Sequence, residues 1–202
     1  MEQVGRIVQS IDFGEEEQCL SEVNAVCKRD CVQISIDGAR DIMMRGLRHF
    51  IGDSAQWLPE YEQIADWLED NQGKGLLCYG HCGRGKTMLT AKVIPCIIHR
   101  WARKTVMCRT AYEAGLQFEQ VMGMKLLCID DVGTEGIVNV YGNKIYALPT
   151  IVNEAERKGN LLLLSTNMTF DEIRAKYGIR TADRITGLCK AVRFRGESLR
   201  GK

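Results

Sequence analysis

The sequence reads Gly80-His81-Cys82-Gly83-Arg84-Gly85-Lys86-Thr87 at the point that decides its fold. This stretch matches G-x-x-x-x-G-K-[ST], in which the glycines let successive backbone N–H groups approach a phosphate. Lys86 would bring a mobile positive charge to the terminal phosphates, and Thr87 would offer a hydroxyl to Mg²⁺. All eight residues are therefore candidate nucleotide-binding residues, and Lys86 is also a candidate catalytic residue.

The surroundings of the loop support a phosphate site. Residues 76–79 form a short apolar run that is typical of a buried strand, and residues 87–94 have the pattern of a helix. The helix would then begin at the loop and point the positive end of its dipole at the phosphate. The alternative is a glycine-rich turn with an incidental lysine, which the order of strand, loop and helix disfavours.

Composition sets wide limits on the function. The chain has 202 residues, 45% of them hydrophobic and 26% charged, with a net charge of +1, which is ordinary for a globular protein that is not basic as a whole. A nucleic-acid contact would have to come from a local patch. There is no apolar run long enough to span a bilayer and no signal-peptide pattern, so we expect a cytoplasmic protein.

The nine cysteines are an odd and high number. Several lie within expected strands, where reduced thiols pack as small hydrophobic groups. Cys19, Cys27 and Cys31 cluster near the N-terminus, but they contain no C-x-x-C pair, which disfavours structural zinc.

From residue 75 onward the pattern alternates between strand and helix, which predicts an α/β fold with a five-stranded, mostly parallel sheet flanked by helices. The expected strands lie near residues 76–79, 105–109, 126–130, 161–166 and 190–195. The expected helices lie near residues 86–101, 111–121, 141–158 and 170–176.

The first part of the chain is less clearly patterned. Helical spacing is present from Glu15 to Cys31 and again from Ala39 to Phe50, and Pro59 suits the first turn of a further helix. We expect residues 1–52 to be a short, mainly helical appendage that could bind a partner. Residues 53–202 would then form the nucleotide-binding domain.

An apolar strand near residues 126–130 ends in two carboxylates, Asp130 and Asp131. In a nucleoside triphosphatase with a phosphate loop, the neighbouring strand delivers an acid to the Mg²⁺ shell, and Asp130 fits that role. Asp131 would activate the attacking water as a general base. The alternative is a turn at the end of the strand, where Asp and Gly are common turn formers.

A second apolar strand near residues 161–166 ends in Thr166 and Asn167. If it lies beside the Asp130 strand, its end brings a neutral polar side chain toward the γ-phosphate and the attacking water. Asn167 is the candidate for that catalytic position, and both residues are candidate nucleotide contacts. The alternative is a helix cap, since a helix is expected near Phe170.

Together these motifs resemble the AAA+ ATPases, and within them the helicase loaders of the DnaC/IstB type. The similarity covers about residues 60–200. Its further motifs are Asp130-Asp131-Val132-Gly133-Thr134-Glu135, Tyr177-Gly178-Ile179-Arg180-Thr181-Ala182-Asp183-Arg184 and Gly196-Glu197-Ser198-Leu199-Arg200. Val132 and Leu199 depart mildly from the family pattern. The resemblance implies a P-loop fold of the AAA+ type with no helical lid after the last strand.

The resemblance also implies roles for three arginines. Arg184 matches an arginine finger that reaches the nucleotide of a neighbouring subunit in a homo-oligomer, and Arg180 is a second candidate. Arg200 matches a sensor arginine that contacts nucleotide in its own subunit. Residues 171–202 hold nine Lys and Arg against four Asp and Glu, which fits contacts with phosphate or single-stranded DNA and also fits an ordinary solvated surface.

The leading hypothesis is an ATP-hydrolysing, Mg²⁺-dependent protein that helps to load a replicative ring helicase onto DNA. One alternative is an IstB-like ATPase that binds DNA and regulates a transposase. Another is a nucleotide-gated adaptor with little hydrolysis. A small-molecule kinase with the same loop is disfavoured by the paired aspartates and the arginine-rich tail.

Overall fold

The computed structural model describes residues 12, 14–15, 18–19, 31–140 and 143–199. Contacts between residues divide the chain into two units, Met1–Asp30 and Cys31–Lys202. In the first unit, residues 14–15 and 18–19 are helical, while the rest of the helix expected up to Cys31 lies outside the described residues. The boundary expected after residue 52 falls inside the second unit.

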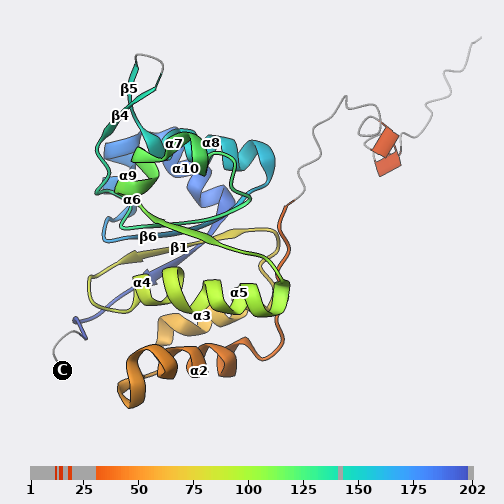
Figure 1. Cartoon of the computed structure of the whole chain (residues 1–202), viewed down its shortest axis with the longest axis vertical. Coiled ribbons are helices and arrows are strands. Elements are labelled where there is room, and N and C mark those ends of the chain that lie inside the picture. The colour runs from red at the N-terminus through yellow and green to blue at the C-terminus, as the bar shows by residue number, and fades with distance from the viewer. Residues whose placement is uncertain (1–11, 13, 16–17, 20–30, 141–142, 200–202) are drawn as a thin grey trace, which may run out of the picture. The chain divides into compact units, whose positions relative to one another are not determined.

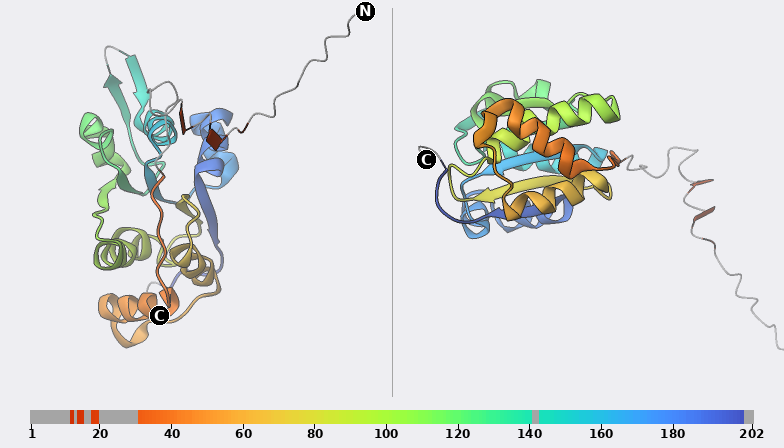
Figure 2. Two further views of the ribbon diagram at one scale, coloured as in Figure 1. Left: turned by 90° about the vertical axis from the view of Figure 1, so that its right-hand side faces the viewer. Right: turned by 90° about the horizontal axis from the view of Figure 1, so that it is seen from below.

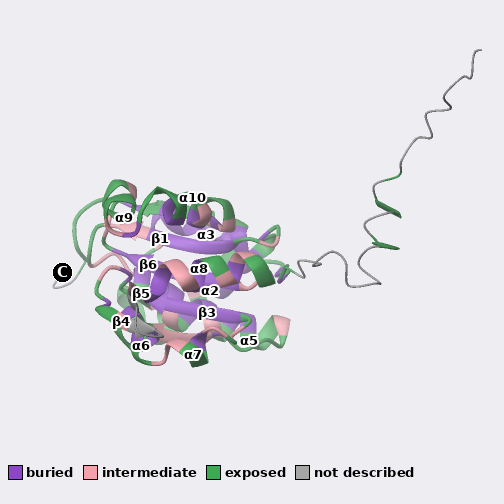
Figure 3. Ribbon diagram, turned by 90° about the horizontal axis from the view of Figure 1, so that it is seen from above, coloured by how far each residue is buried: buried purple, intermediate pink, exposed green. Residues whose placement is uncertain are grey.

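The second unit is built on a parallel five-stranded sheet with the order β2-β3-β6-β1-β7. Its strands are β1 (Gly75–Gly80), β2 (Met107–Thr110), β3 (Leu126–Asp130), β6 (Leu161–Thr166) and β7 (Cys189–Phe194). All five predicted strands are confirmed. The three central strands are buried along most of their length, because helices cover both faces of the sheet (Figure 3).

Two layers of helices enclose the sheet (Figure 1). One face is covered by α2 (Ala39–Ile51), α3 (Pro59–Glu69), α4 (Lys86–Met88), the π-helical segment η2 (Leu89–Val93) and α5 (Ile94–Ala102). The other is covered by α6 (Ala111–Leu116), α7 (Phe118–Val121), α8 (Ala147–Lys158), α9 (Phe170–Tyr177) and α10 (Ile179–Leu188). None of the described helices is long and apolar enough to cross a bilayer, and none follows β7 up to Leu199.

Two regions differ from the sequence prediction. The helix expected from residue 141 begins at Ala147, and an antiparallel hairpin of β4 (Ile137–Val140) and β5 (Asn143–Tyr146) precedes it. The helical register starts only at Ala147 because Leu148, Ile151 and Val152 then face the core. Helix α10 was not predicted at all.

The segment before α2 is part of the core. Val32, Ile34 and Ile36 are 4% exposed or less, and this extended segment runs beside the end of α3. The buried side chain of Asn71 joins the two, since its Nδ2 donates to Val32 O at 2.9 Å and its Oδ1 accepts from Ile34 N at 2.8 Å. The sequence could not show this contact, because its partners are almost 40 positions apart.

We predict that Asn71→Ala lowers the free energy of unfolding by about 2–3 kcal/mol, because it leaves a buried N–H and a buried carbonyl of the 31–36 segment without partners. Urea denaturation followed by circular dichroism measures this change. Gln33→Ala is the control, since Gln33 is exposed on the same segment. Equal effects of the two substitutions would contradict the role given to Asn71.

Candidate nucleotide-binding site

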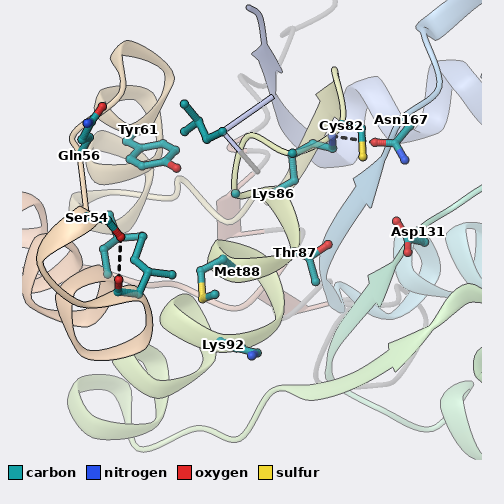
Figure 4. A pocket seen from close by; sticks show the side chains of 15 residues that line it. Ser54, Gln56, Tyr61, Cys82, Lys86, Thr87, Met88, Lys92, Asp131 and Asn167 are labelled. Atoms are coloured by element: carbon teal, nitrogen blue, oxygen red, sulfur yellow. Dashed lines mark hydrogen bonds between the residues drawn. The ribbon is translucent and has the colours of Figure 1, made fainter. Parts of the chain in front are cut away.

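The loop between β1 and α4 opens onto a cavity of about 570 Å³ (Figure 4). Elements distant in sequence contribute to it: the end of α2, the segment before α3, the phosphate loop, and the ends of β3 and β6. The lining residues are Leu47, Ile51, Ser54, Gln56, Tyr61, Cys82, Gly83, Gly85, Lys86, Thr87, Met88, Lys92, Asp131, Asn167 and Leu199. The cavity is large enough to hold a nucleotide.

Lys86 joins the loop to the end of β6. Its Nζ donates to Gly80 O at 2.8 Å, to His81 O at 2.7 Å and to Asn167 Oδ1 at 2.8 Å. Burial lowers the pKa of Lys86, and nearby groups that include Asp131 and Asp130 oppose that shift. The contact with Asn167 confirms that the carboxyl end of β6 meets the phosphate loop, as its neighbouring position in the sheet requires.

Thr87 and Asp130, the two predicted Mg²⁺ ligands, contact each other. Thr87 Oγ1 donates to Asp130 Oδ1 at 3.0 Å, and the Ser165 hydroxyl donates to the same carboxylate oxygen. A hydroxyl and a carboxylate that leave space for water and phosphate oxygens suit Mg²⁺, which rarely uses an all-protein cage. Ser165 was not predicted as a site residue, although it directly precedes the predicted Thr166 and Asn167.

Asp131 lines the cavity from a strained backbone position. Its φ of 54° is left-handed, a conformation that Asp and Asn tolerate better than most residues. Three hydrogen bonds hold it there: Asp131 N donates to Ser165 Oγ at 3.2 Å, and Asp131 O accepts from Thr134 Oγ1 at 2.8 Å and from Thr134 N at 3.1 Å. The backbone is thus fixed, while no described residue forms a hydrogen bond or ion pair with the carboxylate, which faces the cavity.

Thr166 does not reach the cavity. It is fully buried; its hydroxyl donates to Val132 O at 2.6 Å and accepts from Met168 N at 3.0 Å. Its side chain therefore shapes the loop after β3, and the structure does not bring it to the nucleotide site. Glu135 has a similar structural role, because its carboxylate accepts from Gly133 N and from the Tyr177 hydroxyl.

Arg84 faces α3 instead of the cavity. Its Nε and Nη2 both donate to Glu60 Oε1, at 2.9 and 2.7 Å, and the two side chains are only 12% and 7% exposed. Tyr61 OH donates to Arg84 O at 3.0 Å. Burial, with a smaller contribution from Glu60, raises the pKa of Tyr61 to about 12, so this hydroxyl remains a donor at neutral pH.

The end of the described chain lies along the phosphate loop. His81 N donates to Phe194 O at 3.1 Å, and Leu199 N donates to Gly83 O at 2.9 Å. Ser198 packs so closely that a Cβ at Gly83 would lie 2.0 Å from its Oγ. This segment carries Leu199 to the cavity, an arrangement that the sequence alone does not reveal.

Comparisons with known proteins agree with this architecture. A family model described as Nephrocystin 3, N-terminal, matches residues 53–116, which contain the phosphate loop but less than a third of the chain. No curated protein matches the sequence. A primosome component from Streptococcus pyogenes serotype M3 is similar in structure, with a TM-score of 0.50 and 16% identity over 83% of this chain and 88% of that one.

Two further solved structures have the same TM-score of 0.50. The DnaC helicase loader is 14% identical, over 84% of this chain and 97% of that one. AMPPCP-bound DnaA from Aquifex aeolicus is 19% identical, and the match covers 68% of this chain and about half of DnaA, 46%. The chain has the AAA+ fold. At these identities the likeness establishes the fold, and the function has to be argued from the site.

Two of the three predicted arginines, Arg180 and Arg184, lie outside the cavity lining. Arg180 is exposed on α10. Arg184, also on α10, donates from Nε to Glu156 Oε2 of α8 at 2.8 Å. Both helices cover the sheet face opposite to α3 and α4. Arg200 lies outside the described residues, directly after Leu199.

Apolar and aromatic residues that were not predicted as site residues also line the cavity. They are Leu47, Ile51, Tyr61, Met88 and Leu199. With the polar groups of Ser54 and Gln56 beside them, they suit a flat heteroaromatic base. The helical spacing of residues 39–50 could have identified Leu47, but only the folded structure shows that α2 ends at the cavity.

We predict that Gly83→Ala weakens nucleotide binding about tenfold or more, because the new methyl group would collide with Ser198 and because φ at Gly83 is 77°. Ser198→Gly in the same chain should restore part of the affinity by removing the collision. Titration with a fluorescent ATP analogue measures both. If Ser198→Gly gives no recovery, the tail does not pack on the loop as described.

Proposed function

We propose that this chain is an ATP-binding, Mg²⁺-dependent AAA+ ATPase that helps to load a replicative ring helicase onto DNA. One observation carries the ATPase part: Lys86 contacts Asn167 and Thr87 contacts Asp130, and three of these four residues line one cavity. These four residues come from the loop and from two other strands, and they are the polar groups that phosphoryl transfer requires.

Binding of ATP would rearrange the contacts of Lys86. An ammonium group has three N–H donors, and Gly80 O, His81 O and Asn167 Oδ1 accept from all three. A phosphate must therefore replace at least one of these acceptors. Release of Asn167 would free its amide to orient the attacking water, so the same exchange would both bind the phosphate and prepare the site for hydrolysis.

Thr87 and Asp130 are the residues that would hold Mg²⁺. A bound Mg²⁺ would neutralise charge on the β- and γ-phosphates during transfer. Asp131 would accept the proton of the attacking water as general base, since its carboxylate lies on the same cavity wall. Ser165 would position Asp130 by donating to its carboxylate. The loop N–H groups and the start of α4 would bind the remaining phosphate oxygens.

The proposal extends to the partners. Arg184 of one copy would act at the nucleotide of the next copy in a homo-oligomer, with Arg180 as the second candidate. Arg200, which follows Leu199, would act within its own chain. The region proposed to bind the helicase narrows from residues 1–52 to residues 1–30, because residues 31–52 contribute to the core of the second unit. A cytoplasmic location fits these partners.

We predict that Asp131→Asn lowers ATP turnover about a hundredfold or more while nucleotide affinity stays within a factor of about three, because only the general base is lost. Asn also accepts the left-handed backbone at this position, so folding should be preserved. Phosphate release is the measurement, with Glu119→Gln, an exposed carboxylate elsewhere, as the control. Unchanged turnover would remove Asp131 as the base.

We predict that the full chain co-elutes with the replicative ring helicase of its host, and that a non-hydrolysable ATP analogue changes the amount of complex. Removal of residues 1–30 should abolish the complex and leave ATP-analogue binding intact, because the second unit keeps its core. If no complex forms and a transposase is recovered instead, the IstB-like alternative is favoured. A complex with no measurable hydrolysis would favour the nucleotide-gated adaptor.

A further inference from the structure

Charge is distributed very unevenly along this chain. Between Asp70 and Glu113 there are eight Lys and Arg residues and no Asp or Glu, although the whole protein has a net charge of only +1. This segment contains β1, the phosphate loop, α4, η2, α5 and β2. Two of the eight, Arg84 and Lys86, are used in the loop. The others have no assigned role in the nucleotide site, apart from Lys92 at its rim.

Most of the remaining charge lies on one surface. Along η2 and α5 the exposed residues follow helical spacing and extend to the loop before β2. Helix α2 packs beside α5 (Figure 2, right), where the backbone of Gly46 closely approaches Val93, and adds three more basic or imidazole groups. The basic face, as we call this surface, consists of Lys92, His99, Arg100, Arg103 and Lys104 with Arg45, Arg48 and His49.

An aromatic ring lies at the end of the basic face. Trp101 is 50% exposed, and the Arg100 guanidinium is 5.7 Å from its ring centroid. At the other end, Phe50 is 36% exposed and Lys92 Nζ is 5.8 Å from its ring centroid. Exposed aromatic rings are costly to hydrate, and here the ring of Trp101 and the ring of Phe50 each have a cationic side chain within about 6 Å of the ring centroid, in a cation–π contact.

We propose that the basic face binds single-stranded nucleic acid, with Trp101 stacking on a base and the arginines contacting the backbone phosphates. This proposal locates the DNA contact of the proposed function and rests on it. Sequence-independent single-strand binding combines a positively charged track with aromatic side chains, because every base offers a π-face and every nucleotide a phosphate. The track from Lys92 to Arg103 is about 16 Å long at 1.5 Å per residue, enough for a few nucleotides.

The charges of the basic face are available for such a ligand. Among the described residues, Arg100, Arg103 and Lys104 form no ion pair. Helix α2 and the turn after it contain two acidic residues, Asp41 and Asp53. The basic face contains six Lys and Arg residues, so positive charge exceeds negative charge there. This location differs from the basic excess noted in residues 171–202, which lies on other elements.

The same helical segment begins at the nucleotide site. Residues 86–102 run without a break from Lys86 and Thr87 through η2 to Trp101. Lys92 belongs both to the cavity lining and to the basic face. A strand bound along α5 would therefore contact the element that holds the phosphates, which gives a direct route for nucleic acid to change ATP binding.

Fluorescence anisotropy of a labelled 25-nucleotide oligothymidine, titrated with the full chain and an ATP analogue at low salt, tests the proposal. We expect Arg100→Glu/Arg103→Glu to weaken binding at least tenfold and to reduce the slope of log affinity against log salt by about 1–2. Trp101→Ala should weaken binding about tenfold, and Trp101→Phe should retain most of the affinity. The matched control is Arg174→Glu/Arg193→Glu, which reverses two exposed arginines on α9 and β7.

Each outcome separates the possibilities. Equal loss in test and control variants, or full affinity in Arg100→Glu/Arg103→Glu, overturns the proposal. An absence of oligothymidine binding by the unmodified chain also overturns it. So does a test variant that binds DNA normally but no longer retains the ring helicase, because the basic face would then bind an acidic surface of a protein. ATP-analogue binding is measured on the same samples. Its absence in the unmodified chain would refute the proposed function, whatever the DNA result.

Discussion

The buried ion pair between Arg84 and Glu60 is the contact on which the nucleotide site depends. Two charges removed from water cost several kcal/mol each unless they are closely paired, so neither side chain can leave the other without a large penalty. Arg84 is in the phosphate loop and Glu60 is in the first turn of α3. The pair therefore fixes the position of the loop relative to α3, and Tyr61 reinforces it from the next position in the helix. Helix α3 is in turn held by Asn71 and the 31–36 segment, which makes residues far from the cavity part of its support.

The features that sequence predicted are those with a local signal. The five strands are short apolar runs, and the phosphate loop has fixed spacing, so the bounds of every strand were predicted to within two residues. Neighbouring parallel strands end at one edge of a sheet, which is why Asp130 and Asn167 could be expected beside Lys86. Other features depend on contacts across 24 to 116 positions: the docking of residues 194–199 on the loop, the role of Asn71 and the ion pair of Arg84. The β4–β5 hairpin was missed because its strands are only four residues long. The residues of β5 were instead assigned to the helix that follows them, which was predicted to begin near residue 141.

The helical segment from Lys86 to Ala102 combines two tasks through its π-helical turn. A regular α-helix would keep one stripe of residues facing the core over its whole length, whereas the extra residue of a π turn rotates the part of the helix after it. Here η2 lies between the phosphate-binding turn and the exposed stripe of α5. The turn thus allows the N-terminal end of the segment to point its backbone N–H groups at the cavity. The C-terminal end can at the same time pack Ile97 and Ile98 against the core and expose its charged side chains to solvent. If the basic face binds nucleic acid as proposed, this turn lies between the two binding surfaces, where a change at one would be transmitted to the other.

The cavity lacks one component that phosphoryl transfer usually uses. The described residues that line it include Lys86 but no arginine, although developing charge on the γ-phosphate is normally offset by a guanidinium. Within the chain, one candidate is Arg200, which directly follows the cavity-lining residue Leu199 in the sequence. The other candidates, Arg180 and Arg184, are on α10, which covers the opposite sheet face, so under the proposed function they would act at the nucleotide of another copy. Arg184 is held toward that surface by Glu156, which would orient its guanidinium before assembly. Under the proposed function, a polar site that is short of one positive charge would turn over ATP slowly as a single chain, and hydrolysis would then depend on assembly.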